Sequence, residues 1–445
     1  MKKLTFQGGV HPVYHKEITQ DLSITPLPIP KQVTMILHQN IGAPPEPLVA
    51  VGDHVKRGQK IADTKAFVSA PLHASISGKV IALENRLSPI GKEVPALIIE
   101  SDGKDTPYEG LKPYPDLGDM DAAAIRKAMR EGGLVGMGGA MFPSHVKVAV
   151  PEGKSIETVI INGSECEGYL TCDHRLMLEW TDDVIYGIRA LLKAAGAQRA
   201  YIGVEANKPD AIEKLREKLA LLDSGEEIEV KTLAIKYPQG AEKQLLKTLT
   251  GREVPSGGLP IDVGCLVQNV GTVATLARYL RTGMPLVERV VTVSGSAVKN
   301  PGNFLVRIGT SFSYLLEHCG IMGEPKKLIS GGPLMGVAQI TAEVPVLKGT
   351  SGILLFDASD VPAGNARPCV RCGKCVDVCP VYLLPLYLMD YTLKGMLNRA
   401  KEYHILDCIE CGSCSYICPS RRPLVQTIRL GKADVLARQR KNNNG

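Results

Sequence analysis

Two copies of one cysteine spacing near the C-terminus constrain this chain more than any other feature. Both copies read C-x₂-C-x₂-C-x₃-C-P, and their cysteines are, in chain order, Cys369, Cys372, Cys375 and Cys379, then Cys408, Cys411, Cys414 and Cys418. Three thiolates on a tight loop can bind three irons of a cubane, and the x₃ gap begins a helix that carries the fourth thiolate away. The spacing therefore predicts two [4Fe–4S] clusters and a protein that moves single electrons.

The same spacing predicts how the two copies share their ligands. In bacterial two-cluster ferredoxins, the fourth cysteine of each run ligates the cluster of the other run. We therefore expect one cluster on Cys369, Cys372, Cys375 and Cys418, and the second cluster on Cys408, Cys411, Cys414 and Cys379.

Structural zinc and a disulfide framework are the alternative interpretations of these cysteines. Zinc sites more often pair two short elements across a longer gap. Disulfide frameworks suit short secreted chains, and the first residues here lack the apolar core of a signal peptide. Both alternatives are disfavoured against two complete eight-ligand copies. The remaining cysteines are expected to be small buried hydrophobes, namely Cys166, Cys172, Cys265 and Cys319.

Length and composition set the wider limits. A chain of 445 residues has room for three or four domains, and 44% hydrophobic with 22% charged residues fits an ordinary folded protein. The formal net charge of +6 comes without a dense basic cluster interleaved with aromatics, which argues against nucleic acid. No run of about 18 apolar residues exists, so no membrane span is expected.

The N-terminal quarter predicts an arm and a β domain. Residues 1–30 are proline-rich and are expected to form an extended arm over another domain. Residues 31–105 alternate short β-branched runs with glycine turns and resemble a lipoyl-type barrel-sandwich. Such modules can carry a cofactor on a lysine at a hairpin tip, and Lys65 is the nearby candidate. Because Phe67 lies nearer the expected tip, a purely structural module is favoured.

Residues 106–284 predict a Rossmann-like domain. A helix over 122–132 is followed by the glycine-rich loop 136–147, and strands then alternate with helices, which argues for a parallel sheet. Polar loops follow three of the predicted strands, at 162–175, 237–244 and 267–272. Each loop alone could be a capped turn. Together, at the carboxyl ends of strands, they predict a ligand site.

The last two regions complete a multidomain α/β fold. Residues 285–358 are β-rich and predict a β-grasp domain. Residues 359–445 hold the α-helical two-cluster ferredoxin domain and a basic helix near 425–440. That helix is expected to be a solvated surface helix, with contact to a membrane partner as the alternative.

Taken together, these motifs resemble the RnfC family, the peripheral subunits of Rnf ferredoxin:NAD⁺ oxidoreductase complexes. The resemblance is carried by the segment 6–12, the loop 136–147, the loop 162–175 and the twin cysteine motifs. The central half is similar to the flavin- and NADH-binding subunit of respiratory complex I, and 285–358 resembles the SLBB fold. The resemblance implies FMN on the glycine-rich loop and NAD(H) above it.

Carried over residue by residue, the resemblance names fourteen cofactor-binding positions. The flavin loop is matched by Gly136, Gly138, Gly139, Ala140 and Lys147, with Phe142 beside the nicotinamide; the later motifs are matched by Asn162, Glu165 and Glu167, by Tyr237, Gly240 and Glu242, and by Asn269 and Thr272. The chain departs from complex I at four positions. Ser164 replaces an aspartate, Ala241 and Gly271 replace glutamates, and Leu259 replaces an aromatic residue.

The resemblance implies a peripheral subunit on the cytoplasmic side of the cell membrane. Electrons would pass from reduced ferredoxin, through membrane-embedded and flavin-bearing partner subunits, to two clusters, FMN and NAD⁺. Partner subunits would couple this transfer to Na⁺ or H⁺ transport. Two alternatives stay open: an NADH-dependent cobalamin reductase of a bacterial microcompartment, which shares this domain order, and an electron relay without NAD binding.

Overall fold

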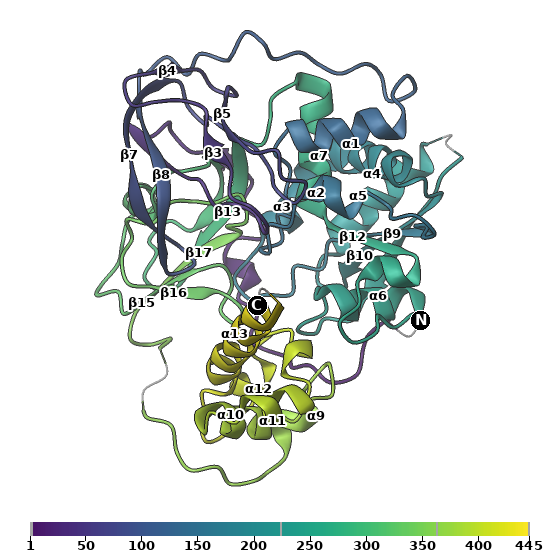
Figure 1. Ribbon diagram of the computed structural model, residues 1–445, viewed down its shortest axis with the longest axis vertical. Coiled ribbons are helices and arrows are strands. Elements are labelled where there is room, and N and C mark those ends of the chain that lie inside the picture. The colour runs from purple at the N-terminus through teal and green to yellow at the C-terminus, as the bar shows by residue number, and fades with distance from the viewer. Residues whose placement is uncertain (1–2, 223–224, 362–363, 444–445) are drawn as a thin grey trace.

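The computed structural model describes residues 3–222, 225–361 and 364–443. Figure 1 shows the N-terminal strands at upper left, a helix-covered sheet at right, a second β region between them, and the cysteine-rich helices at the bottom. The ends of the predicted arm and ferredoxin domain, residues 1–2 and 444–445, lie outside the described residues. Among the described helices, none combines the length and the apolar character needed to cross a bilayer.

The N-terminal β domain consists of two small sheets, ordered β2-β8-β7-β4 and β3-β5-β6. The strands are β2 Gln32–Ile36, β3 Glu46–Pro47, β4 His54–Val55, β5 Lys60–Asp63, β6 Leu72–His73, β7 Gly78–Ser88 and β8 Lys92–Ser101. Val80, Leu97 and Ile99 are buried in the core of this domain. Lys65 is exposed on the loop between β5 and β6.

The N-terminal arm is partly structured. It forms the short helix η1 Lys16–Ile18 and the strand β1 Ile24–Pro26, which pairs in parallel with β14 (Gly302–Arg307) at a sheet edge. Pro26 is tolerated there because an edge strand can leave one N–H position without a partner. Earlier in the arm, Val10 forms a bridge to Tyr237. The arm thus contacts two domains.

The central domain is a four-stranded parallel sheet, ordered β11-β10-β9-β12. Its strands are β9 Thr158–Asn162, β10 Arg199–Glu205, β11 Glu227–Leu233 and β12 Cys265–Asn269. Its helices are α1 Ala122–Glu131, α2 Ser144–Lys147, α3 Cys172–Glu179, α4 Thr181–Ala195, α5 Pro209–Ala220, α6 Glu242–Thr250, η2 Pro260–Val263 and α7 Val270–Thr282. The predicted alternation of strands and helices is confirmed. Because β10 and β12 flank β9 on opposite sides, the strand order reverses between β9 and β12.

The third region is a six-stranded mixed sheet, ordered β1-β14-β13-β17-β15-β16. Its further elements are β13 Glu288–Ser294, α8 Phe312–Cys319, β15 Lys327–Ser330, β16 Val337–Gln339 and β17 Gly352–Phe356. Val291, Phe312 and Ile353 are buried in its core.

The C-terminal module is helical. Its elements are α9 Lys374–Asp377, α10 Pro385–Leu393, α11 Leu397–Glu402, η3 Ile405–Asp407, α12 Ser413–Tyr416 and α13 Leu424–Asn443. The short helices α9 and α12 each follow a glycine in the left-handed region, Gly373 and Gly412, both with φ of 77°. Glycine adopts this conformation without steric cost, so each cysteine loop can turn directly into a helix.

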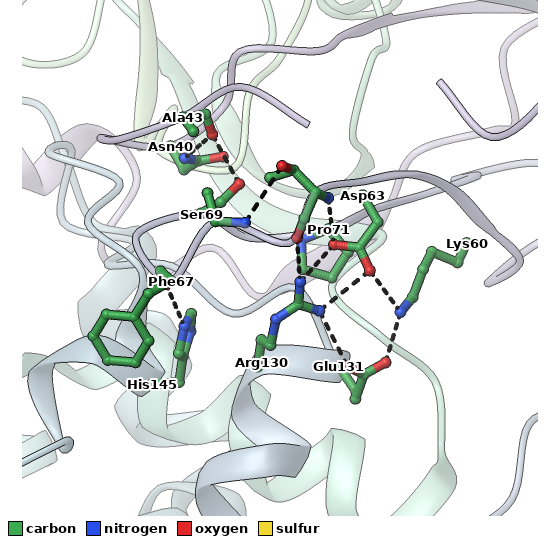
Figure 2. A network of polar contacts seen from close by, with 12 residues as sticks. Asn40, Ala43, Lys60, Asp63, Phe67, Ser69, Pro71, Arg130, Glu131 and His145 are labelled. Atoms are coloured by element: carbon green, nitrogen blue, oxygen red, sulfur yellow. Dashed lines mark hydrogen bonds and ion pairs between the residues drawn. The ribbon is translucent and has the colours of Figure 1, made fainter. Parts of the chain in front are cut away.

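Charged side chains join the β domain to the central domain, as Figure 2 shows. Arg130 of α1 donates two hydrogen bonds to the Asp63 carboxylate, at 2.7 and 3.2 Å, and Lys60 lies 3.0 Å from the same group. Burial alone would raise the pKa of Asp63, but the hydrogen bonds from Arg130 and Lys60 outweigh it and lower this pKa to about 2. At the expected hairpin tip, the Phe67 carbonyl lies 3.0 Å from His145 Nε2 of α2.

Candidate functional site

Two asparagines mark the point where the strand order reverses. Asn162 ends β9, Asn269 ends β12, and the two residues are paired in register. Asn162 Nδ2 donates to the Gly240 carbonyl at 2.7 Å, and Asn269 Oδ1 accepts from the Gly271 N–H at 2.8 Å, which caps α7. Ligands of open α/β sheets bind beyond the carboxyl ends of the strands at such a reversal. We call this region the strand-end site.

The glycine-rich loop lies beside the strand-end site. The Met137 N–H donates to Thr272 Oγ1 of α7 at 3.0 Å, and a Cβ added to Gly138 would lie 3.5 Å from the Asn269 side chain. Gly139 has φ of 114°, and a Cβ there would meet open space. The exposed backbone at Gly138, Gly139 and Ala140 can therefore approach a ligand closely.

Unpaired polar atoms near these strand ends fit a polar ligand. Ser164 Oγ and both polar atoms of the Gln268 side chain are buried without a hydrogen-bond partner. Such groups are costly to bury unless something satisfies them, so they mark a place for ordered water or a ligand. With the exposed glycine backbone, this donor set fits a flavin nucleotide. Gln268 lies inside a predicted loop but was not singled out, because a glutamine at the end of a strand carries little signal of its own.

Lys147 and Phe142 close the far end of the loop. Lys147 Nζ lies 2.8 Å from the Glu242 carboxylate and 3.0 Å from the Val267 carbonyl. Phe142 is half-buried, and its carbonyl accepts from the Gly136 N–H at 2.8 Å. The predicted cation thus lies at the same sheet edge as Asn162 and Asn269, where it is paired with a predicted acidic residue.

Asp173 is a site residue that sequence reasoning missed. Its Oδ2 accepts from Asn269 Nδ2 at 2.7 Å, while Glu165 accepts from the Asp173 N–H at 2.7 Å and the His174 N–H at 3.2 Å. Burial and the neighbouring Glu165 charge raise the pKa of Asp173 to about 7. Asp173 opens an ordinary helical pattern, so only the fold reveals its contact with Asn269.

Arg289 is a second residue missed from the sequence. This buried side chain of β13 donates to the Met137 carbonyl at 3.2 Å and to the Lys348 carbonyl at 2.6 Å. It therefore ties the glycine-rich loop to the mixed sheet. A single arginine inside a β-branched run was the available signal, because a buried charge must find partners.

Two predicted site residues point toward the cysteine module instead. The Glu167 carboxylate accepts from the Leu334 and Met335 N–H groups at 3.0 and 2.8 Å. The Tyr237 hydroxyl donates to the Cys411 carbonyl at 2.7 Å and lies 3.4 Å from Glu167. These contacts place Glu167 and Tyr237 between the parallel sheet, the mixed sheet and the cysteine module.

The eight motif cysteines fall into two sets. One cavity is lined by Cys379, Cys408, Cys411 and Cys414. Burial raises the pKa of Cys408 to about 11 and that of Cys414 to about 12, with the neighbouring thiols adding to both shifts. In the other set, burial raises the pKa of Cys375, and Cys418 and Cys369 lie close enough to add to it. Each set combines three cysteines of one run with the fourth of the other, which fits the shared ligation of two cubanes.

The remaining predictions on single residues have mixed outcomes. Cys166, Cys172, Cys265 and Cys319 are free thiols and buried, as predicted. Leu259, which replaces an aromatic residue of complex I, is 63% exposed. A small side chain at Gly271 would meet Asn269 Oδ1 at 3.0 Å, so the helix cap at this position leaves little room for a longer residue.

Family models match four successive parts of the chain. They are the RnfC barrel sandwich hybrid domain over 4–104, the Nuo51 FMN-binding domain over 129–278, the SLBB domain over 290–338 and a 4Fe–4S dicluster domain over 362–419. This order is the predicted one, and the fold class and the FMN and iron–sulfur cofactors are thereby confirmed.

Relatives match along nearly the whole chain, and each is the RnfC-type member of its complex. The chain is 47% identical over 444 residues, covering both chains completely, to that of the Na⁺-translocating ferredoxin:NAD⁺ oxidoreductase complex of Acetobacterium woodii. It is 47% identical over 432 residues to the proton-translocating counterpart of Clostridium ljungdahlii, covering 97% of this chain and 94% of that one. The counterpart in the ion-translocating oxidoreductase complex of Rhodobacter capsulatus is 40% identical over 445 residues, covering 99% and 85%.

Among solved structures, an NAD⁺-reducing [NiFe]-hydrogenase in the air-oxidized state shares the fold. Its TM-score is 0.52 at 19% identity, covering 66% of this chain and 55% of that one. Identity of 40% or more along almost the entire length is decisive, however, where fold similarity alone is not. The chain belongs to the RnfC family, whose members are subunits of ion-translocating ferredoxin:NAD⁺ oxidoreductase complexes.

Proposed function

We propose that this chain is the NAD(H)-linked peripheral subunit of an Rnf complex on the cytoplasmic side of the membrane. It would exchange electrons between NAD⁺ and partner subunits that receive them from reduced ferredoxin, coupled to Na⁺ or H⁺ transport by those partners. One observation carries the proposal: the loop Tyr237–Glu242 contacts both the strand-end site and a cysteine set. Gly240 accepts from Asn162, and Tyr237 donates to Cys411.

The residues at the strand-end site would hold the flavin and orient the nicotinamide. FMN supplies the change between hydride transfer and single-electron transfer when bound there. Gly138, Gly139 and Ala140 would present backbone groups to it, and Asn162 and Asn269 would fix its polar edge. Hydride transfer needs no protein acid or base, so the acidic residues would act through position and charge.

Several predicted residues would act on the cofactors indirectly. Thr272 would hold the glycine-rich loop through the Met137 N–H, and Lys147 would compensate anionic ligand charge at the cost of its Glu242 pairing. Glu165 would set the protonation of Asp173, whose pKa it raises. Phe142 would flank the nicotinamide from the end of the loop.

An anaerobic titration tests this function. The purified chain is loaded with iron, sulfide and FMN, and NADH is added while flavin and iron–sulfur absorbance are followed separately. We expect both absorbances to bleach. If NADH leaves the flavin oxidised while dithionite reduces it, the chain is an electron relay without NAD binding and the proposed function is overturned.

A further inference from the structure

We infer that the two cluster sites have a fixed order. Cys379, Cys408, Cys411 and Cys414 form an inner site, adjacent to the strand-end site, and Cys369, Cys372, Cys375 and Cys418 form an outer site that faces away from it. This inference rests on the proposed function and deepens it, because it says by which cluster electrons enter and leave the flavin.

One short loop joins the strand-end site to the inner site. At one end, the Tyr237 hydroxyl donates to the carbonyl of Cys411 at 2.7 Å. Three residues later, the Gly240 carbonyl accepts from Asn162 at 2.7 Å. Three Cα–Cα steps of about 3.8 Å span at most about 11 Å. The backbones that contact the two sites are therefore close neighbours.

Further contacts enclose the inner site from other parts of the chain. Gln244 Nε2 of α6 donates to the Pro380 carbonyl at 3.2 Å, and the Gly9 N–H donates to the Val378 carbonyl at 2.8 Å. A Cβ added to Gly412 would lie 3.0 Å from the Leu334 carbonyl of the mixed sheet. The arm, the parallel sheet and the mixed sheet all pack on this site.

The outer site has a different environment despite an identical sequence spacing. Cys369 and Cys372 are exposed, whereas Cys379, Cys411 and Cys414 are buried. Val370 beside them is 67% exposed. Gly373 has the same φ as Gly412, 77°, yet a Cβ added to it would meet nothing within 4 Å. The difference between the sites therefore comes from tertiary packing alone.

The electron count is simple in either direction. In the reductive direction, two electrons pass singly from a partner subunit to the outer site, the inner site and the flavin; with one proton they convert NAD⁺ to NADH. No further oxidant or reductant is needed. The outer site is thus the exit that a partner must reach.

Selective removal of one cluster tests the order. Cys411→Ala removes a ligand from the inner site, and Cys372→Ala removes the equivalent ligand from the outer site. Each FMN-loaded variant is illuminated anaerobically with EDTA, which reduces the flavin without NADH, and the surviving cluster is followed by electron paramagnetic resonance. We expect light-driven reduction of the cluster that survives in Cys372→Ala, and loss of that reduction in Cys411→Ala. Dithionite and iron content confirm that the surviving cluster is present.

The reverse pattern would overturn the order, and so would equal reduction in both variants. Because EDTA replaces NADH, the result is separate from the test of the proposed function. If either cysteine variant fails to fold, the pair Gly412→Ala and Gly373→Ala decides, since both glycines share φ and differ in packing. We expect slower light-driven cluster reduction and an altered inner-cluster spectrum in Gly412→Ala relative to Gly373→Ala. Equal effects of the two substitutions, or a larger effect of Gly373→Ala, would contradict the proposal.

Discussion

Buried charged side chains hold the domains of this protein together. Lys348 is fully buried, and its Nζ donates to the Pro71 and Gly133 carbonyls, each at 2.8 Å. It thus joins the mixed sheet to the β domain and to the residues that precede the glycine-rich loop. A buried ammonium without a paired carboxylate is costly to charge, and burial lowers the pKa of Lys348 to about 7.

The lowered pKa of Lys348 predicts a pH dependence of stability. Between about 7 and the ordinary value of 10.5, the unfolded chain keeps a proton that the folded chain has released. The free energy of unfolding should therefore rise with pH in this window, by up to about 1.4 kcal/mol per pH unit for one proton. Urea unfolding at several pH values measures it. The slope should flatten in Lys348→Met and persist in the surface control Lys326→Met; an unchanged slope in Lys348→Met would assign it to other groups.

The Arg130–Asp63 contact predicts a second stability effect. Arg130→Met removes both hydrogen bonds to a half-buried carboxylate, which should lower the free energy of unfolding by about 1–3 kcal/mol. Because the pKa of Asp63 is lowered to about 2 from 3.8, its contribution should be full above the ordinary value and fade as the pH falls toward 2. Arg199→Met breaks an exposed pair with Glu227 and should leave the unfolding midpoint unchanged. Equal shifts in both variants would count against a special role for Arg130.

At the scale of elements, the glycine-rich loop depends on its neighbours for its position. Its start is fixed by Arg289 of β13 and by Thr272 of α7, and its end by Lys147 pairing with α6. These elements belong to two different domains. A loop that is weakly specified by its own residues thus becomes a defined platform.

The Thr272 contact predicts an effect on flavin affinity. Thr272→Val keeps the side-chain shape but removes the acceptor for the Met137 N–H. The loss of one hydrogen bond of about 1 kcal/mol should weaken FMN binding about fivefold. Quenching of flavin fluorescence measures this affinity. Thr282→Val, at the opposite end of α7, should bind FMN as the unaltered chain does; equal weakening in both would indicate a general effect on the helix.

At the scale of the whole molecule, packing makes two sequence repeats unequal. The inner site is enclosed by the arm and both sheets, while the outer site is exposed on one side of the module. Burial keeps solvent, oxidants and chelators away from a cluster, so the two sites should differ in how readily they are attacked.

This inequality predicts two phases of iron loss. On exposure to air or to a strong chelator, the loaded protein should first lose the outer cluster and then, more slowly, the inner one. Released iron and the paramagnetic spectrum follow the two phases. In Cys372→Ala the fast phase should be absent. A single phase in the unaltered chain would indicate that both sites are equally accessible.

Local patterns in the amino-acid sequence were enough to predict the fold class, the cofactor types and most elements. Cluster ligands recur at short intervals, and β-strands and helices leave periodic patterns, so Arg199–Glu205 was predicted with its bounds. The polar residues at strand ends were also visible, because parallel strands place their carboxyl ends together.

Which of these residues lie together depended on the packing of distant segments. Asp173, Arg289 and Gln268 joined the site through the fold, while Glu167 and Tyr237 were placed toward the cysteine module. Two identical cysteine spacings gained different environments for the same reason. Ligand chemistry depends on local spacing, whereas burial and the order of sites depend on long-range packing that no local pattern records.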